Sequence, residues 1–312
     1  MNPFPVNWPS VSVHNRNAWR RNIDCQVLAN YFPLSNEPAL ISESQAAGNV
    51  IVIAGKARAG GKSVFSHRLL HEFSGAGLIP LDLMGPNEFN AAKDDTDNDS
   101  CFMRILDWAE LEGVIVAEKA KASILGKPNW QMRNYELKNA LGASRVAIRL
   151  PRLDVTVKLK DIAVDIKKYV TSAGILEDSI YLYEYSYSQV SDWKNLQRSL
   201  TDVTDGVKLV NANLLLVGDV MKFIRYILTK YGIPDSALDW NGTEAFFKEL
   251  ASSKNGPKNN IGDLSNILHI AFEKSMNAGE QRVPSWRIAH EYWEYYKDLG
   301  GGSPETPPAG VS

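Results

Sequence analysis

The sequence lacks abundant cysteines, a long apolar run and an excess of basic residues, the features that are typical of secreted, membrane-spanning and nucleic-acid-binding proteins respectively. Its two cysteines, Cys25 and Cys101, form neither a disulfide framework nor a metal-ligand spacing. No apolar run approaches the roughly 18 residues of a membrane span, and the first residues lack the basic start and apolar stretch of a signal peptide. A formal net charge of −2 excludes a global basic field that would recruit nucleic acid or an anionic membrane. These absences predict a cytoplasmic protein.

The most informative stretch that is present ends in Gly60-Gly61-Lys62-Ser63. An apolar run over 50–54 precedes it and a segment with helical spacing follows, which is the strand–loop–helix context of a phosphate-binding loop, or P-loop. The backbone N–H groups and the helix N-terminus would face an anion. Lys62 would bring a positive charge to the β- and γ-phosphates, and the Ser63 hydroxyl would reach a Mg2+ ion. We therefore expect a nucleotide-binding site formed by Gly55, Lys56, Gly60, Gly61, Lys62 and Ser63.

This loop is one residue longer than the standard G-x4-G-K-[ST] pattern. Counting back from Lys62 places the first glycine at position 56, but the chain has Lys56 there and the glycine one position earlier, at Gly55. The alternative interpretation is a glycine-rich turn between a strand and a helix that binds nothing.

The lysine directly after the first glycine gives the loop two lysines. In this the chain resembles the deviant Walker A family, the ParA/MinD-type ATPases of plasmid partition, division-site placement and conjugal transfer, whose loop reads G-K-G-G-x-G-K-[ST]. The chain differs by the added residue and by Ala57 and Arg58 in place of two glycines. The resemblance implies ATP and Mg2+ as ligands. It also implies a homodimer or homo-oligomer, in which Lys56 reaches the nucleotide of the other subunit.

Two further segments bear on this resemblance. The run 77–87 occupies the place of the family's Asp-x-Asp-Pro-like strand end, and Asp82 matches the second aspartate, which positions or deprotonates the attacking water in the family. A carboxylate at the end of the strand next to the loop strand would lie near the γ-phosphate. Asp82 as a strand-end cap or turn residue is the alternative. The segment 145–151 resembles the Walker B strand, but Arg149 stands where the family has its aspartate. Asp219 follows an apolar run and could end a central strand, which makes it a further candidate near the metal; a loop or cap role is the alternative.

Beyond the loop, short apolar runs alternate with helical segments, which predicts an α/β fold with a doubly wound, mostly parallel sheet. We expect an N-terminal extension over 1–48, a P-loop nucleotide-binding domain over 49–232, a helical region over 233–299 and a disordered tail over 300–312. Strands are expected near 50–54, 78–84, 145–150, 179–188 and 213–217. The pattern over 102–125 is helical, as is that over 130–141.

Two other patterns leave alternatives open. Four tyrosines alternate along one predicted strand, either as a platform for stacking bases or as packing against helices; they are Tyr181, Tyr183, Tyr185 and Tyr187. His67 and His71 are four residues apart on the helix after the loop, a spacing that can hold a metal, but no H-E-x-x-H arrangement completes it.

The preferred functional hypothesis is a cytoplasmic ATPase that dimerises with ATP and acts as a switch in DNA maintenance or transfer, with DNA or a DNA-bound protein as partner. Lys62, Asp82 and Lys56 are its candidate catalytic residues. A second hypothesis is a nucleotide-binding regulatory or assembly protein that has lost hydrolysis, because Arg149 stands at the Walker B-like position. A third is a small-molecule phosphotransferase. The sequence does not distinguish ATP from GTP.

Overall fold

The computed structural model describes residues 48–56, 62–83, 98–114, 117–150, 159–187, 190–211, 217–252 and 261–298. The predicted N-terminal extension up to residue 47, the predicted tail from residue 300 and the middle of the glycine-rich loop lie outside these ranges. Within the described ranges, no helix is long and apolar enough to cross a membrane.

The described part of the chain contains a five-stranded sheet in the order β2-β3-β4-β1-β5, and each of its strand pairings is parallel. The strands are β1 (Val50–Lys56), β2 (Ile79–Asp82), β3 (Val146–Arg149), β4 (Ile180–Tyr187) and β5 (Val207–Asn211). The middle strands read as nearly continuous apolar runs because helices bury both of their faces. The predicted parallel α/β sheet is thereby confirmed.

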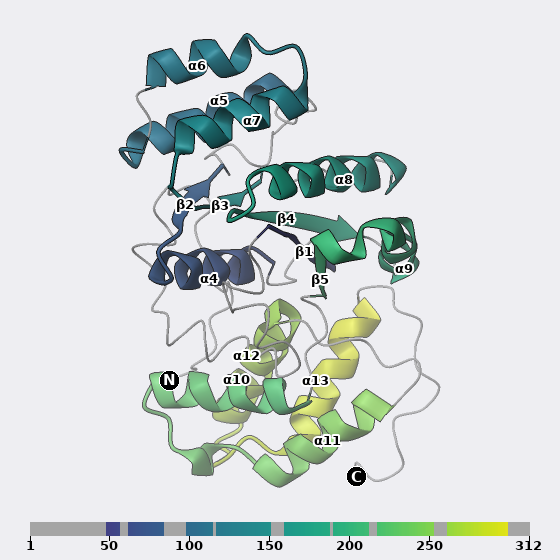
Figure 1. Cartoon of the computed structure of the whole chain (residues 1–312). Coiled ribbons are helices and arrows are strands. Elements are labelled where there is room, and N and C mark those ends of the chain that lie inside the picture. The colour runs from purple at the N-terminus through teal and green to yellow at the C-terminus, as the bar shows by residue number, and fades with distance from the viewer. Residues whose placement is uncertain are drawn as a thin grey trace.

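Helices cover both faces of this sheet, as a doubly wound fold requires (Figure 1). On one side of the sheet lie α5 (Asn98–Leu111), α7 (Trp130–Leu141), α8 (Leu159–Ile175) and α9 (Val190–Ser199), with α6 (Ala117–Leu125) packed on α5 and α7. On the other side α4 (Lys62–Gly75) packs against the strands, and beyond it lie α10 (Val217–Lys230), α11 (Trp240–Ser252), α12 (Ile261–Asn277) and α13 (Ser285–Asp298), whose apolar side chains join the same hydrophobic cluster. Two short 3-10 turns, η4 (Thr201–Gly206) and η5 (Asp235–Ala237), complete the described elements.

The four alternating tyrosines of β4 all point to the α5–α9 face, where they are buried in its core. Tyr169 of α8 packs on two of them, with ring centroids 5.5 Å from Tyr181 and 6.2 Å from Tyr183. Burial raises the pKa of Tyr185 to about 12. The tyrosines therefore pack against helices and offer no open surface on which a base could stack.

Two predicted elements differ from the structure. The helix expected over 102–125 is broken between α5 and α6, because Gly113 adopts a left-handed φ of 72° and closes α5. The strand expected over 213–217 is contradicted at Val217, which opens α10, while 213–216 lie outside the described residues; the described strand of this region is β5, which spans Val207–Asn211. β5 is an edge strand with a half-buried Lys208, so it lacks the continuous apolar run of the inner strands.

The C-terminal helices share one hydrophobic core with the sheet and α4. Phe65 and Phe73 of α4 belong to the same cluster as Phe223 of α10, Phe247 of α11 and Tyr292 of α13. Phe247 is fully buried, and its ring meets Tyr292 edge-on with centroids 6.3 Å apart. The helical region and the layer that carries the predicted phosphate-binding loop therefore belong to one continuous hydrophobic cluster.

Because of this shared core, Phe247→Ala is expected to lower the free energy of unfolding of the whole chain by about 3–5 kcal/mol, the usual effect of a large-to-small change in a core. Met276→Ala on α12 is the matched control; Met276 is 48% exposed, so its loss should stay within about 0.5 kcal/mol. Urea unfolding followed by circular dichroism measures both variants. Equal stabilities for the two would contradict a core shared between sheet and helical region.

Candidate nucleotide-binding site

The predicted phosphate-binding loop joins the carboxyl end of β1 to the start of α4. β1 lies inside the sheet, between β4 and β5, and α4 begins at Lys62. Strand, loop and helix thus follow one another as the sequence predicts. Residues 57–61 lie outside the described residues, and so do the side chains of Lys56 and Ser63. Ligands of parallel sheets bind at this edge, beyond the carboxyl ends of the strands.

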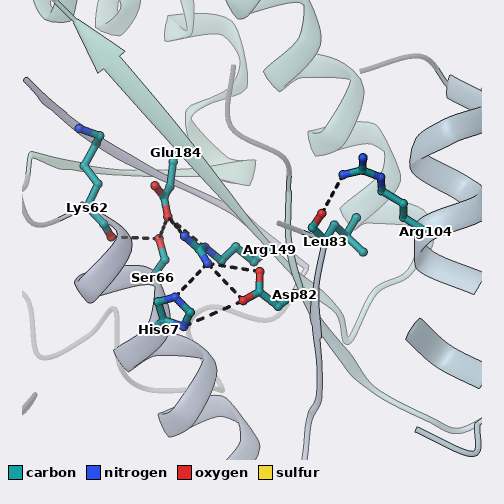
Figure 2. Close-up of polar contacts among 8 residues, drawn as sticks. All are labelled: Lys62, Ser66, His67, Asp82, Leu83, Arg104, Arg149 and Glu184. Carbon is teal, nitrogen blue, oxygen red and sulfur yellow. Dashed lines mark hydrogen bonds and ion pairs between the residues drawn. The ribbon is translucent and has the colours of Figure 1, made fainter. Parts of the chain in front are cut away.

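Lys62 is the first residue of the 14-residue helix α4 and is 3% exposed. Its side chain extends away from the charged groups beneath the helix (Figure 2). No acidic residue occupies the first turn of α4, so no carboxylate there competes for the backbone N–H groups that a helix N-terminus leaves without intrahelical partners. The start of α4 therefore combines a cation with a helix N-terminus, which suits an anion.

Beneath α4 lies a buried ion cluster, by which we mean Asp82, Arg149 and Glu184 together with Ser66 and His67 of α4 (Figure 2). The three charged residues lie on neighbouring strands, β2, β3 and β4. Side chains alternate between the two faces of a strand, and the sequence neighbours of all three residues face the α5–α9 side. The charged side chains therefore point to the α4 face, under the helix.

Arg149 holds the cluster together. Its Nε and Nη2 atoms donate to Glu184 Oε1 at 3.0 and 2.7 Å, and its Nη1 atom lies 3.2 Å from Asp82 Oδ2. The side chain of Arg149 is 1% exposed, that of Glu184 is 0% exposed and that of Asp82 is 4% exposed. Buried charges are costly unless paired, and removing one partner of such a pair typically destabilises by about 3–5 kcal/mol.

His67 belongs to this cluster as a neutral ring. Arg149 Nη1 donates to His67 Nε2 at 3.1 Å, which leaves the ring hydrogen on Nδ1, 4.0 Å from Asp82 Oδ2. Burial, followed by the charge of Arg149, holds the pKa of His67 well below its usual range. No group of metal-binding side chains occurs among the described residues, so the spacing of His67 and His71 does not create a metal site in this part of the chain.

The structure changes the reading of the predicted carboxylates. The expectation that Asp82 ends a strand next to the loop strand is wrong, because β3 and β4 separate β2 from β1. Arg149, at the Walker B-like position, is an ion-pair partner of Asp82. The expectation that Asp219 could end a strand is also wrong, since it lies in the first turn of α10, where it is buried. The role of Asp82 in hydrolysis stays a prediction.

The sequence analysis missed Glu184. This residue is the buried carboxylate on β4, the strand directly beside β1. A signal was present: Glu184 is a single acidic residue in an apolar and aromatic strand, and Arg149 is a single basic residue in another. Because an isolated charge is not buried without a partner, two opposite charges in two inner strands indicate a pair.

No family model and no curated protein matches this chain. Among solved structures, it is similar to the Aeropyrum pernix ORC2 protein in its ADP form, with 13% identity, 92% of this chain and 71% of that chain covered, and a TM-score of 0.45. It is also similar to Cdc6p from Pyrobaculum aerophilum, with 10% identity, 89% of this chain and 71% of that chain covered, and a TM-score of 0.46. A third similar structure is a Walker-type ATPase of Pyrococcus abyssi, with 14% identity, 91% of this chain and 75% of that chain covered, and a TM-score of 0.40. Similarity this low assigns neither family nor function, and the resemblance to ParA/MinD-type ATPases is not confirmed.

The ion cluster predicts a large and non-additive effect on stability. Arg149→Met leaves two carboxylates buried without their cation and is expected to cost about 3–5 kcal/mol of unfolding free energy. Adding Glu184→Gln should cost less in the Arg149→Met background than in the native chain, because the carboxylate has already lost its partner.

The matched control is the exposed pair formed by Lys167 and Asp202, whose charged atoms lie 2.8 Å apart. Lys167→Met should change stability by at most about 1 kcal/mol, as is usual for a surface ion pair. Guanidinium unfolding measures all four variants, and an Arg149→Met variant as stable as Lys167→Met would contradict the buried pairing.

Proposed function

We propose that this chain binds a nucleoside triphosphate, ATP together with Mg2+, at the loop between β1 and α4. The observation that carries the proposal is the position of Lys62, which opens a long helix directly after an inner strand of a parallel sheet and points away from the buried ion cluster. Gly55 is buried near the end of β1, and the glycines that the sequence places in the loop would let its backbone approach phosphates closely.

In this proposal each part of the loop acts through simple electrostatics. The N–H groups at the start of α4 and the ammonium group of Lys62 neutralise the phosphates, and the N-terminal end of the helix dipole adds to this attraction. The Ser63 hydroxyl is the proposed Mg2+ ligand. ATP, with three phosphates and a metal, presents the charge that such a loop binds best.

A specific observation favours a second candidate, a nucleotide-binding regulatory or assembly protein with little hydrolysis. Asp82 and Glu184 are both paired to Arg149 and covered by α4. A general base must come within hydrogen-bond reach of the water that it activates, and a carboxylate held under a helix does not meet this requirement. Hydrolysis by the first candidate would need Asp82 to leave Arg149.

The finer proposal, a switch that dimerises with ATP and acts with DNA or a DNA-bound protein, rests on the sequence resemblance and on Lys56. We do not extend it to plasmid partition, because the strand order separates Asp82 from the loop strand. ATP turnover measured with and without DNA separates the switch from the regulatory protein: turnover that DNA stimulates favours the switch.

Lys62→Ala is expected to weaken ATP binding by about 10–100-fold, because hydrogen bonds to charged groups contribute about 1.5–3 kcal/mol each. Lys119→Ala on α6, an exposed lysine on the opposite side of the sheet, is the control and should bind like the native chain. Isothermal titration with ATP and Mg2+ measures the affinities. The proposal is overturned if the native chain binds no ATP or if Lys62→Ala binds it equally well.

Lys56→Ala tests the switch. If Lys56 reaches the nucleotide of a second subunit, the variant should bind ATP with nearly native affinity as a monomer, and it should fail to dimerise. Light scattering of both proteins with ADP and with a non-hydrolysable ATP analogue measures the mass. A native chain that stays monomeric with the analogue would rule out the dimerising switch. The proposal that the chain binds ATP would not be affected by this result.

A further inference from the structure

Ser66 links the first turn of α4 to the buried ion cluster. Its hydroxyl lies 2.7 Å from Glu184 Oε1 and 3.1 Å from the carbonyl oxygen of Lys62 (Figure 2). A hydroxyl has one hydrogen to donate, and the shorter distance to the carboxylate favours Glu184 as its acceptor. Ser66 is four residues after Lys62, so the contact to Glu184 fixes the turn of helix that Lys62 begins.

Glu184 is well placed to act on this turn because β4 is hydrogen-bonded to β1. In the register of the two strands, Glu184 is opposite Ile53 and Ser186 is opposite Gly55. The carboxylate therefore lies three residues before the end of β1 at Lys56, under the helix that follows the loop.

The carboxylate of Glu184 is itself held rigidly. Arg149 Nε and Nη2 both donate to Oε1, the same oxygen that Ser66 contacts, while Nη1 of the arginine is bound by Asp82 on the edge strand. Three strands of the sheet thus hold one oxygen atom in place beneath α4. An apolar contact between α4 and the sheet would bury the same surface, but it would not fix the orientation of the helix, because the hydrophobic effect is non-directional.

We propose that Glu184 is a positioning residue of the nucleotide site. By holding Ser66 it sets the direction in which the start of α4 presents its N–H groups and the Lys62 side chain to the phosphates. This inference rests on the proposed ATP site and assigns to Glu184 no contact with the nucleotide. A misplacement of about 1 Å in such a first turn is enough to weaken several phosphate contacts together.

Ser66→Ala tests the proposal with the smallest change, since it removes the hydroxyl and keeps a good helix former. The matched control is Ser172→Ala on α8. Ser172 is also fully buried, its hydroxyl also contacts the carbonyl four residues earlier, and it has a second side-chain partner in Trp130, but it lies on the other face of the sheet. Both variants should lose some stability.

Only Ser66→Ala is expected to weaken ATP binding, by about five- to tenfold. The effect is smaller than that of Lys62→Ala because Ser66 acts on the phosphates only through the position of the helix. Affinities are measured by titration with ATP and Mg2+ at a temperature where circular dichroism shows both variants folded. Glu184→Gln, which keeps the shape and removes the charge, should weaken ATP binding in the same direction.

The outcomes separate this inference from the proposed function. If Ser66→Ala binds ATP like the native chain while Lys62→Ala does not, Glu184 has no positioning role and the nucleotide site stands. If Ser66→Ala and Ser172→Ala weaken binding equally, the effect is general destabilisation, and the positioning role is overturned. A native chain that binds no ATP overturns the nucleotide site and the positioning role together.

Discussion

The guanidinium group of Arg149 imposes the constraint on which the rest of the described structure depends. It lies 1% exposed between the carboxylates of Asp82 and Glu184, and each of these charges would be expensive to bury alone. The pairing requires β2, β3 and β4 to keep their observed register and requires α4 to cover them. A slip of one residue in β3 would turn Arg149 to the tyrosine-lined face and leave both carboxylates without a partner.

Around this constraint the molecule is built from two apolar layers of different character. The α5–α9 face is filled by the tyrosines of β4 and by a compact group of helices, while the other face carries α4 and then the C-terminal helices in one continuous core (Figure 1). On the α4 face, the charged residues of the ion cluster lie on β2, β3 and β4. The loop strand β1 is apolar on both faces up to Ala54.

In this arrangement, the residues suited to bind phosphates are separate from the buried carboxylates, whereas the sequence motif alone suggests that Lys62 and Asp82 act at one site. The start of α4, with Lys62, is suited to bind phosphates, whereas Asp82 and Glu184 are engaged beneath the same helix and stabilise its position. A carboxylate that holds a helix in place contributes to binding through geometry, and one that activates water must reach the substrate. In the proposed function, nucleotide binding at the start of α4 therefore does not depend on hydrolysis.

The sequence by itself determined the strand–loop–helix at Lys62, the parallel α/β class and the positions of most helices, because these depend on local spacing and on continuous apolar runs. It did not determine which strands are neighbours, since strand order is set by non-local crossovers and by pairing across the whole sheet. In the observed order, two strands separate Asp82 from the loop strand β1, and Glu184 lies on β4, directly beside β1. Arg149, which replaces the Walker B aspartate in the sequence comparison, forms the centre of the ion cluster. Only tertiary structure could bring together three charges from positions 82, 149 and 184, because their attraction acts only once the sheet has formed and water has been excluded from its face.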